Sequence, residues 1–273
     1  MNAIFEPLIG AGVFPLGLVL FLVLSLACEA GYRVGIWRDA RHGRQGKERP
    51  DVAILTSGML TLLAFMLGLS IDFAQQRFEA RRDLVAVEAN AIGTAWLRAN
   101  MVGGPEGTRI ADLIHDYART RLAFTQAEMR GPVAGLVART EAQQGAIWQV
   151  AGLVARRAPT PITAALISAL NTMFDAALSQ RFAFDARVPD SMLTVLLLGG
   201  VIAIGAVGYQ MGLAGARQPI VSSLLLMLWT CGMVITVDLN RPRLGHIRVD
   251  ASPLVWTLES FAQKPLAIPS PTP

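Results

Sequence analysis

The sequence predicts an all-α membrane protein in which four transmembrane helices form two hairpins around a helical, water-facing middle region. The 273 residues are 53% hydrophobic and only 16% charged, whereas about a quarter of the residues of a soluble domain are charged. The hydrophobic residues are concentrated in four blocks. Buried core helices of a large soluble protein are the alternative, but four such long, nearly charge-free runs rarely coincide in one soluble domain.

Each of the four apolar blocks is long enough to cross a bilayer. The blocks cover about residues 8–31, 52–71, 192–216 and 220–237. A helix needs about 20 apolar residues to cross a hydrocarbon core of about 30 Å, and inside lipid it satisfies its own backbone hydrogen bonds. Glu6 precedes the first block, and no basic residue lies beside it. Because a signal peptide begins with a positively charged segment, this favours a retained span over a signal peptide.

The blocks divide the chain into four parts. These are a first transmembrane hairpin (1–72), a helical middle region (73–190), a second transmembrane hairpin (191–238) and a C-terminal tail (239–273). The third block holds Gly208 and Gly212 in GxxxG register. Because small residues at this spacing let membrane helices approach closely, we expect the third span to pack tightly against another helix.

The middle region has the pattern of a helical bundle. Its apolar residues recur at intervals of three and four, as on one face of a helix. Two stripes show this spacing: Ile110, Leu113, Ile114 and Tyr117, and Ile162, Leu166, Ile167, Leu170, Met173, Phe174 and Leu178. Gly and Pro clusters near 104, 131 and 160 divide the region into about four helices. Such amphipathic faces need partners in the bundle or in neighbouring subunits.

The second span is predicted to continue into the middle region as one long helix. No Pro or Gly interrupts residues 69–92. From Val52 to Met101 a single helix would be roughly 75 Å long at about 1.5 Å per residue.

The exit of this helix from the apolar block carries a specific pattern. Phe65, Leu67 and Gly68 form an aromatic-x-Leu-Gly element, and Arg77, Phe78 and Arg82 belong to a run that starts nine residues after the glycine. This pattern resembles the second membrane helix of bestrophins, pentameric ion channels with the same order of hairpin, middle region and hairpin. Glu79 stands where bestrophins carry a second Trp, so the packing role of that position is not carried over.

Over most of its length the chain is still more similar to a group of bacterial and plant bestrophin-like membrane proteins. Shared with them are the Arg-Phe-Glu-x-Arg-Arg run, a second run with Glu88 and Asn90, and a third with Asp238, Arg241, Pro242 and Gly245. The resemblance implies a multi-pass protein of the bacterial inner membrane. It also implies a homo-oligomer, most simply a pentamer, and an ion channel.

The resemblance places the neck of such a channel on the second span. The positions that match the bestrophin neck are Thr61, Phe65 and Leu69. Residues four apart share a helix face, and five such stripes would form an apolar constriction that gates ions by dewetting. The alternative is that Phe65 and Leu69 simply pack between helices.

Asp72 follows the neck positions and is a candidate for ion selection. An acid at the end of a span is costly unless it faces water or a partner, and a ring of acids attracts cations. At about 100° per residue, Asp72 lies about 60° and Arg77 about 80° from the direction of Leu69, which slightly favours cations. The alternative is an interfacial Asp72 paired with Gln76 or a basic neighbour.

The other charged residues of these motifs also have structural interpretations. Arg81 and Arg82 are expected at lipid headgroups. Asp238 is expected to pair locally with Arg241, and Glu88 is expected to pair within the bundle, as is Asn90. Asp238 and Asp250 are too sparse to resemble the calcium clasp of animal bestrophins, so no calcium gating is expected.

The sequence predicts neither an enzyme nor a cofactor or metal site. His42, His115 and His246 lie far apart, and none has metal-ligand spacing with Cys, Asp or Glu. The chain has no phosphate loop, nucleophile elbow or HExxH motif. Its Arg residues cluster beside the spans, where anionic lipid explains them better than nucleic acid. The expected partners are therefore membrane lipid, inorganic ions and further copies of the chain.

Two questions stay open at the level of sequence. The basic residues of the loop between spans one and two predict that this loop is cytoplasmic. The basic residues after span four predict the opposite orientation, with the C-terminal tail in the cytoplasm. The bestrophin resemblance favours a cytoplasmic middle region. The functional alternative to a channel is a non-conducting membrane scaffold or sensor whose helical bundle binds a partner.

Overall fold

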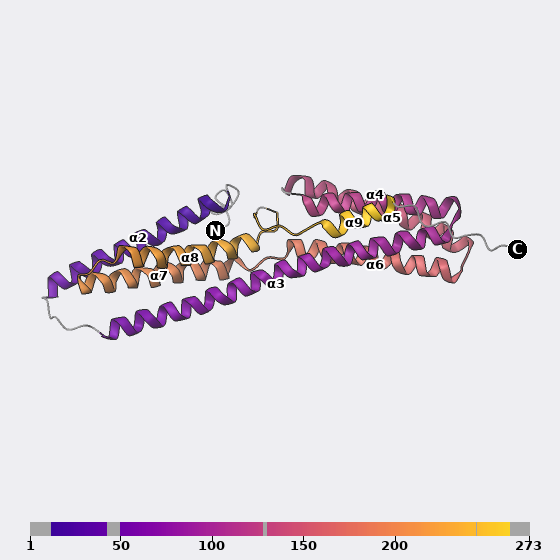
Figure 1. Cartoon of the computed structure of the whole chain (residues 1–273). Helices are drawn as coiled ribbons and strands as arrows, with labels where there is room; N and C mark the ends of the chain where they lie inside the picture. Colours follow the sequence, from indigo (N-terminus) through magenta and orange to yellow (C-terminus); the bar gives the residue numbers. More distant parts are fainter. Residues whose placement is uncertain (1–11, 43–49, 128–129, 244, 263–273) are drawn as a thin grey trace. The chain divides into compact units, whose positions relative to one another are not determined.

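The computed structural model describes residues 12–42, 50–127, 130–243 and 245–262, and every regular element among them is an α-helix. The helices are α2 (Val13–His42), α3 (Pro50–Val102), α4 (Gly104–Gln126), α5 (Arg130–Arg157), α6 (Pro161–Asp185), α7 (Asp190–Ala214), α8 (Pro219–Leu239) and α9 (Ser252–Ala262) (Figure 1). The predicted all-α fold is confirmed. Glu6 and the first residues of the first apolar block lie outside the described residues.

Five of these helices are long and apolar enough to cross a membrane. Four of them, α2, α3, α7 and α8, contain the four apolar blocks of the sequence. The fifth is α6, whose mean hydropathy of 1.3 is well below the values of 2.1 to 2.3 found for the other four. The count of four spans therefore stays a prediction.

Helix α3 is the long helix that the sequence predicts. It has 53 residues, which corresponds to about 80 Å at a rise of about 1.5 Å per residue. It begins at Pro50, a position where proline is favoured because the first amides of a helix have no intrahelical partner.

The chain forms two compact units. We call residues 1–78 and 187–247 the apolar unit, and residues 79–186 and 248–273 the bundle unit. Helix α3 contributes to both, since Phe78 ends its share of the apolar unit and Glu79 begins its share of the bundle unit. The expected C-terminal tail is divided in the same way, and its residues Ser252–Ala262 form α9, a helix that the sequence pattern did not predict.

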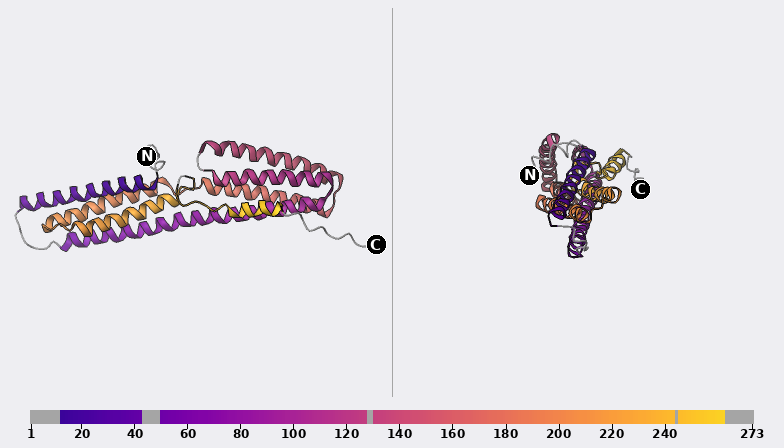
Figure 2. Two further views of the ribbon diagram at one scale, coloured as in Figure 1. Left: turned by 45° about the horizontal axis from the view of Figure 1, so that its top comes forward. Right: turned by 90° about the vertical axis from the view of Figure 1, so that its left-hand side faces the viewer.

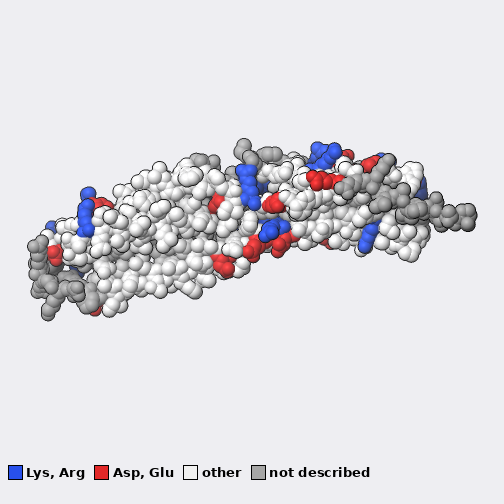
Figure 3. All heavy atoms as spheres, viewed as in Figure 1, with Lys and Arg blue, Asp and Glu red and all other residues white. Residues whose placement is uncertain are grey.

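In the apolar unit, α7 and α8 lie between α2 and the first part of α3 (Figures 1 and 2). Helix α2 packs against both α7 and α8, and its buried residues recur every four positions: Leu16, Leu20, Leu24 and Cys28. They meet Leu196, Ile204, Leu226 and Met233 in one apolar core. In Figure 3 the face of this unit in view is almost free of charge between its ends, as expected for a surface in lipid.

The contact between α2 and α7 depends on glycine. A Cβ on Gly208 of α7 would overlap the carbonyl oxygen of Cys28, and a Cβ on Gly31 of α2 would overlap that of Gly205. A Cβ on Gly212 would lie 2.3 Å from the carbonyl oxygen of Tyr32. The close packing predicted from the GxxxG register is confirmed, and the partner helix is α2.

The bundle unit buries the predicted apolar stripes. Ile110, Ile114 and Tyr117 of α4 are fully buried, as are Leu170 and Met173 of α6. The outer members of the second stripe differ, because Ile162 and Leu178 lie at the surface. Burial raises the pKa of the Tyr117 phenol, and the nearby carboxylate of Glu88 adds to this effect, so the phenol stays neutral.

Helix α9 closes the bundle unit. Leu254 is buried in its core, and the ring of Phe261 stacks on that of Trp96 with 4.5 Å between the centroids. Asp250 holds the start of α9, since its Oδ1 accepts hydrogen bonds from the backbone N–H and the hydroxyl of Ser252 at 2.9 and 2.6 Å. These hydrogen bonds lower the pKa of Asp250.

Candidate functional site

The residues predicted for a pore neck lie on one exposed face of α3. The side chain of Phe65 is 63% exposed and that of Leu69 is 40% exposed, and Thr61 is exposed as well. Measured around the helix from Thr61, Phe65 lies at about 40°, Leu69 at about 80° and Asp72 at about 20°. All four predicted residues therefore fall within one quadrant of the helix.

The opposite side of α3 is buried inside the apolar unit. Leu63, Ser70 and Ala74 are at most 5% exposed, and Ser70 and Ala74 lie at about 180° and 220° from Thr61. Leu63 packs against Gly199 of α7, while Leu67 packs against Gly232 of α8. The packing of α3 within its own chain leaves the quadrant of Thr61 uncovered.

Asp72 is exposed at the polar end of this face. The amide Nε2 of Gln76 donates a hydrogen bond of 2.7 Å to its Oδ2. The local pairing with Gln76 foreseen as an alternative is thus present. It leaves the second carboxylate oxygen available, because one amide donor satisfies only part of the accepting capacity of a carboxylate.

In the run from Arg77 to Arg82, some side chains lie at the surface and others in the interior. Arg77 and Arg82 are exposed. Phe78 packs against a small cluster of Ala74, Val188 and Leu239, so the matching aromatic position is a packing residue of the apolar unit.

Arg81 does not lie at a lipid surface, and that expectation was wrong. Its side chain is fully buried. Nε donates to the carbonyl oxygen of Ala183 at 3.0 Å and Nη2 donates to that of Ala186 at 2.7 Å. These carbonyls belong to the end of α6, where the last turn of a helix lacks intrahelical donors and attracts cations. Arg81 therefore ties α3 to the C-terminus of α6.

Glu88 belongs to a buried polar network of the bundle unit. Its carboxylate accepts hydrogen bonds from Nε and Nη2 of Arg121, and Nη2 also donates to Oε1 of Gln180. Gln180 in turn donates to the hydroxyl of Thr125 at 3.2 Å. Glu88 thus pairs within the bundle as expected, whereas Asn90, two residues on, is exposed.

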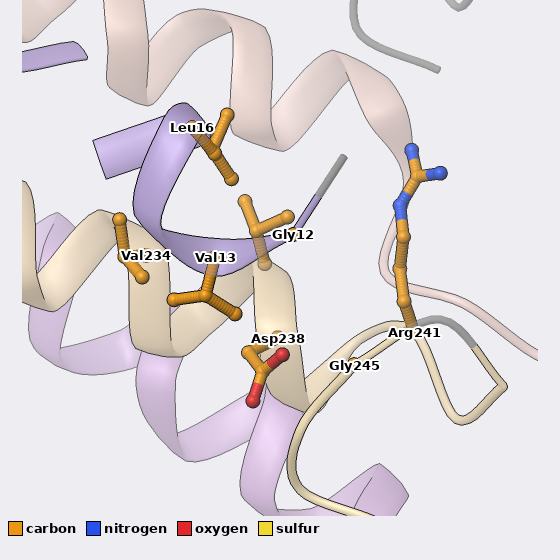
Figure 4. A pocket seen from close by; sticks show the side chains of 8 residues that line it. Gly12, Val13, Leu16, Val234, Asp238, Arg241 and Gly245 are labelled. Carbon is orange, nitrogen blue, oxygen red and sulfur yellow. The ribbon is translucent and has the colours of Figure 1, made fainter. Parts of the chain in front are cut away.

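The motif after the last membrane helix forms a tight loop around Asp238. The backbone N–H groups of His246 and Ile247 donate to the two oxygens of this carboxylate at 2.8 and 3.1 Å. Figure 4 shows Asp238 beside Gly245, with the guanidinium of Arg241 pointing away from the carboxylate. The expected local ion pair between Asp238 and Arg241 is therefore replaced by backbone donors.

A further residue of this segment, Asn240, joins the loop to the start of the second hairpin. Its Oδ1 accepts a hydrogen bond of 2.6 Å from the backbone N–H of Val188. Asn240 and Val188 are both buried. The Asp-x-x-Arg-Pro-x-x-Gly motif therefore stabilises the backbone at the end of α8. Among the described residues, no group of three His, Cys, Asp or Glu side chains could bind a metal.

A family model described as a bestrophin-like domain matches residues 31–254. The chain belongs to the bestrophin-like family. The match covers both the neck positions of α3 and the loop around Asp238. No curated protein matches the chain in sequence.

Solved structures share the fold of this bestrophin-like chain. The crystal structure of a variant of a bacterial bestrophin homologue from Klebsiella pneumoniae superimposes with a TM-score of 0.65 and 14% sequence identity, covering 89% of this chain and 96% of that one. Another crystal structure of a homologue from the same organism gives a TM-score of 0.62 at 14% identity, over 88% and 94% of the two chains. At this level of identity the likeness shows the fold alone.

Sequence reasoning missed several residues that organise these sites. Arg121, Gln180 and Asn240 are buried polar residues whose partners lie between 33 and 59 residues away in the sequence. The one available signal was their position, since Arg121 and Gln180 each fall on the apolar side of an amphipathic helix.

Proposed function

We propose that this bestrophin-like chain is a subunit of an ion channel whose pore is lined by the uncovered face of α3. In a ring of subunits Thr61, Phe65 and Leu69 would form a narrow apolar neck. Such a neck gates ions because water leaves it when it is narrow. Asp72 would stand just beyond the neck, at the mouth of the pore.

The observation that carries the proposal is a difference between two exposed faces of the apolar unit. The exposed face of α8 consists mainly of large apolar residues, as expected next to lipid: Ile220, Val221, Leu224, Met227, Leu228 and Ile235. The exposed stripe of α3 around Thr61 contains small or polar residues as well: Ser57, Gly58, Ala64, Gly68 and Asp72. Small residues are typical of contacts between membrane helices, and an acid needs water or a partner.

The proposal requires several copies of the chain, because one helix face cannot enclose a path for ions. A homo-oligomer would cover the small residues of the α3 stripe with a neighbouring subunit and turn the neck residues toward a shared axis. The family resemblance makes five the expected number of subunits. Mass measurement of the purified protein in mild detergent or nanodiscs tests this number.

Cations are the proposed permeant ions. Asp72 lies about 20° from Thr61 around the helix, whereas Arg77 lies about 160° from it. Of the two charged side chains nearest the neck, Asp72 is therefore on the proposed pore face. A ring of carboxylates attracts cations into a pore mouth.

Ion flux from proteoliposomes that contain the purified protein tests the channel. Phe65→Ala, which widens the neck, is expected to raise the flux several-fold. Leu228→Ala removes an apolar side chain of similar exposure from α8 and is expected to leave the flux unchanged. If sodium, potassium and chloride all fail to pass through wild type and Phe65→Ala protein, the channel proposal is wrong and the non-conducting scaffold stands.

A further inference from the structure

The bundle unit contains a cavity, whereas the residues of the proposed pore face belong to the apolar unit. The cavity has a volume of about 220 Å³ and lies between α5 and α6, with Arg121 of α4 among its lining residues. This volume is below the roughly 300 Å³ at which pockets for drug-sized ligands begin, so the cavity suits a small metabolite.

Arg121 offers an unused hydrogen-bond donor to this cavity. Its side chain is only 2% exposed, and Glu88 and Gln180 bind its Nε and Nη2 atoms. Within the part of the chain that the structure describes, Nη1 has no hydrogen-bond partner. Since Nη1 is not among the fully enclosed polar atoms that lack a partner, it is open to the cavity, where it can donate a hydrogen bond to a ligand oxygen.

Asp175 offers the opposite kind of group. Its exposed carboxylate lines the same cavity, and among the described residues it forms no ion pair or hydrogen bond. The other charges cancel in pairs, because Arg121 pairs with Glu88 and Arg181 pairs with Glu141 at 3.1 Å. The net charge of the cavity is therefore that of Asp175, −1, and it favours a cation.

The cavity wall is mixed. Val137 of α5 and Phe174 and Leu178 of α6 contribute apolar surface, and Thr140 and Glu141 of α5 contribute polar surface. Gln144 also lines the cavity, and its Nε2 donates to the Tyr117 hydroxyl at 3.3 Å. A short chain of methylene groups suits the apolar side chains, and polar groups at its two ends suit Asp175 and Arg121.

We propose that this cavity binds a small primary amine with a neutral oxygen acceptor, an amide or a hydroxyl, at its other end. The ammonium group would pair with Asp175, and the oxygen would accept a hydrogen bond from Nη1 of Arg121. A carboxylate in place of the neutral acceptor would meet the negative charge of Glu88 behind Arg121. The ligand class is therefore a monocation rather than a zwitterion or an anion.

Ligand-induced thermal stabilisation and calorimetry on the full-length protein in detergent test the site. The probes are ω-amino amides with three to five methylene groups, and the controls are the alkylamine and the alkanamide of the same length. At least one amino amide is expected to bind about tenfold more tightly than either control, because each control leaves one polar group of the cavity without its partner. The amino acid with the same chain is expected to bind more weakly than the amino amide.

Two variants in the cavity and one control variant outside it separate the site from unspecific binding. Asp175→Asn is expected to weaken amino-amide binding about tenfold, whereas Asp185→Asn removes an exposed acid from the same helix outside the cavity and is expected to change nothing. Ala177→Leu places a larger side chain in the cavity and is expected to abolish binding. The proposal is overturned if no amino amide binds, if the alkylamine binds equally well, or if Asp175→Asn binds like wild type.

Discussion

Gly245 lies so close to Asp238 that a Cβ on the glycine would stand 2.7 Å from Oδ1 and 2.8 Å from the carbonyl oxygen of that residue. The spacing of seven residues in the family motif is thus a spatial contact. Asp238 holds the amides of His246 and Ile247, and the chain can pass this close to the carboxylate only where it has no side chain. The acid and the glycine form one structural element at the end of α8.

Gly245→Ala is therefore expected to destabilise the protein, by about 1–3 kcal/mol, because the added methyl group must displace backbone atoms. Asp238→Asn is expected to cost about 1–2 kcal/mol, since an amide oxygen accepts more weakly than a carboxylate and one backbone donor loses its partner. Thermal unfolding in detergent measures both. Gly135→Ala, at a helix position with open space around it, is the control and is expected to change stability little.

The contact between α2 and α7 gives a second prediction. Gly208→Ala is expected to lower stability strongly, by about 2–4 kcal/mol, because its methyl group would overlap the backbone of Cys28 and separate the two helices. Gly17→Ala also adds a methyl group to a membrane helix, but the nearest atom, on the side chain of Val234, would lie at an ordinary contact distance of 3.5 Å. Equal loss of stability in the two variants would contradict the packing described for α2 and α7.

The ion pair of Glu88 and Arg121 gives a third prediction. Arg121→Met leaves a buried carboxylate without its partner and is expected to cost about 3–5 kcal/mol. Adding Glu88→Leu is expected to recover part of that loss, because the double variant contains no unpaired buried charge. The exposed pair of Arg157 and Glu106, at 3.1 Å, is the control, and Arg157→Met is expected to cost less than about 1 kcal/mol. Additive losses at Glu88 and Arg121 would show that the two residues do not act as a pair.

The hydrogen bonds from Ser252 to Asp250 give a pH-dependent prediction. They lower the folded-state pKa of Asp250 below its ordinary value of 3.8. The stabilisation of α9 by this group is therefore fully present above about pH 4 and is lost as the pH falls through the lower, folded-state pKa. Amide hydrogen exchange of α9 should be faster in Asp250→Asn than in wild type at neutral pH. The difference should shrink when the wild-type carboxyl is protonated, and a difference that persists unchanged in acid would contradict the role of this carboxylate.

The helices and the membrane character were largely readable from the sequence. The apolar blocks can be identified from the length of their runs without charged residues, and the continuous α3 from the absence of helix-breaking residues after Leu69. Both properties can be read from neighbouring residues along the chain. Helix α9 was missed because it has only 11 residues and because the burial of its Leu254 depends on tertiary contacts. The tight approach of α7 was predictable from Gly208 and Gly212, but its partner was not, since any membrane helix can meet a small-residue face.

The polar sites were less predictable than the helices. Arg81 looks like a headgroup-binding residue in sequence, yet it binds the carbonyls of Ala183 and Ala186, more than 100 residues away. Asp238 looks like a partner for Arg241, yet it binds backbone amides of the following loop. In both cases the partner is a backbone group, and backbone groups carry no sequence signal. By contrast, the exposed face of α3 follows from helix periodicity once the buried side is known.

Asp72 gives the prediction that bears most directly on ion selectivity. Its carboxylate is exposed on the proposed pore face, about one turn beyond Leu69, and only Gln76 binds it within the described chain. Neutralising the acid is expected to reduce cation preference, because a ring of carboxylates concentrates cations at the pore mouth. The measurement is the reversal potential in a salt gradient for wild type, Asp72→Asn and Gln76→Ala.

Gln76→Ala separates the charge of Asp72 from its hydrogen bond. It frees the carboxylate without removing its charge and is expected to retain the cation preference of wild type, whereas Asp72→Asn is expected to shift the reversal potential toward zero. High salt should diminish the difference between wild type and Asp72→Asn, since the Debye length falls from about 10 Å at 0.1 M to about 3 Å at 1 M. A wild type that selects anions, or an Asp72→Asn variant with unchanged selectivity, would exclude Asp72 from ion selection.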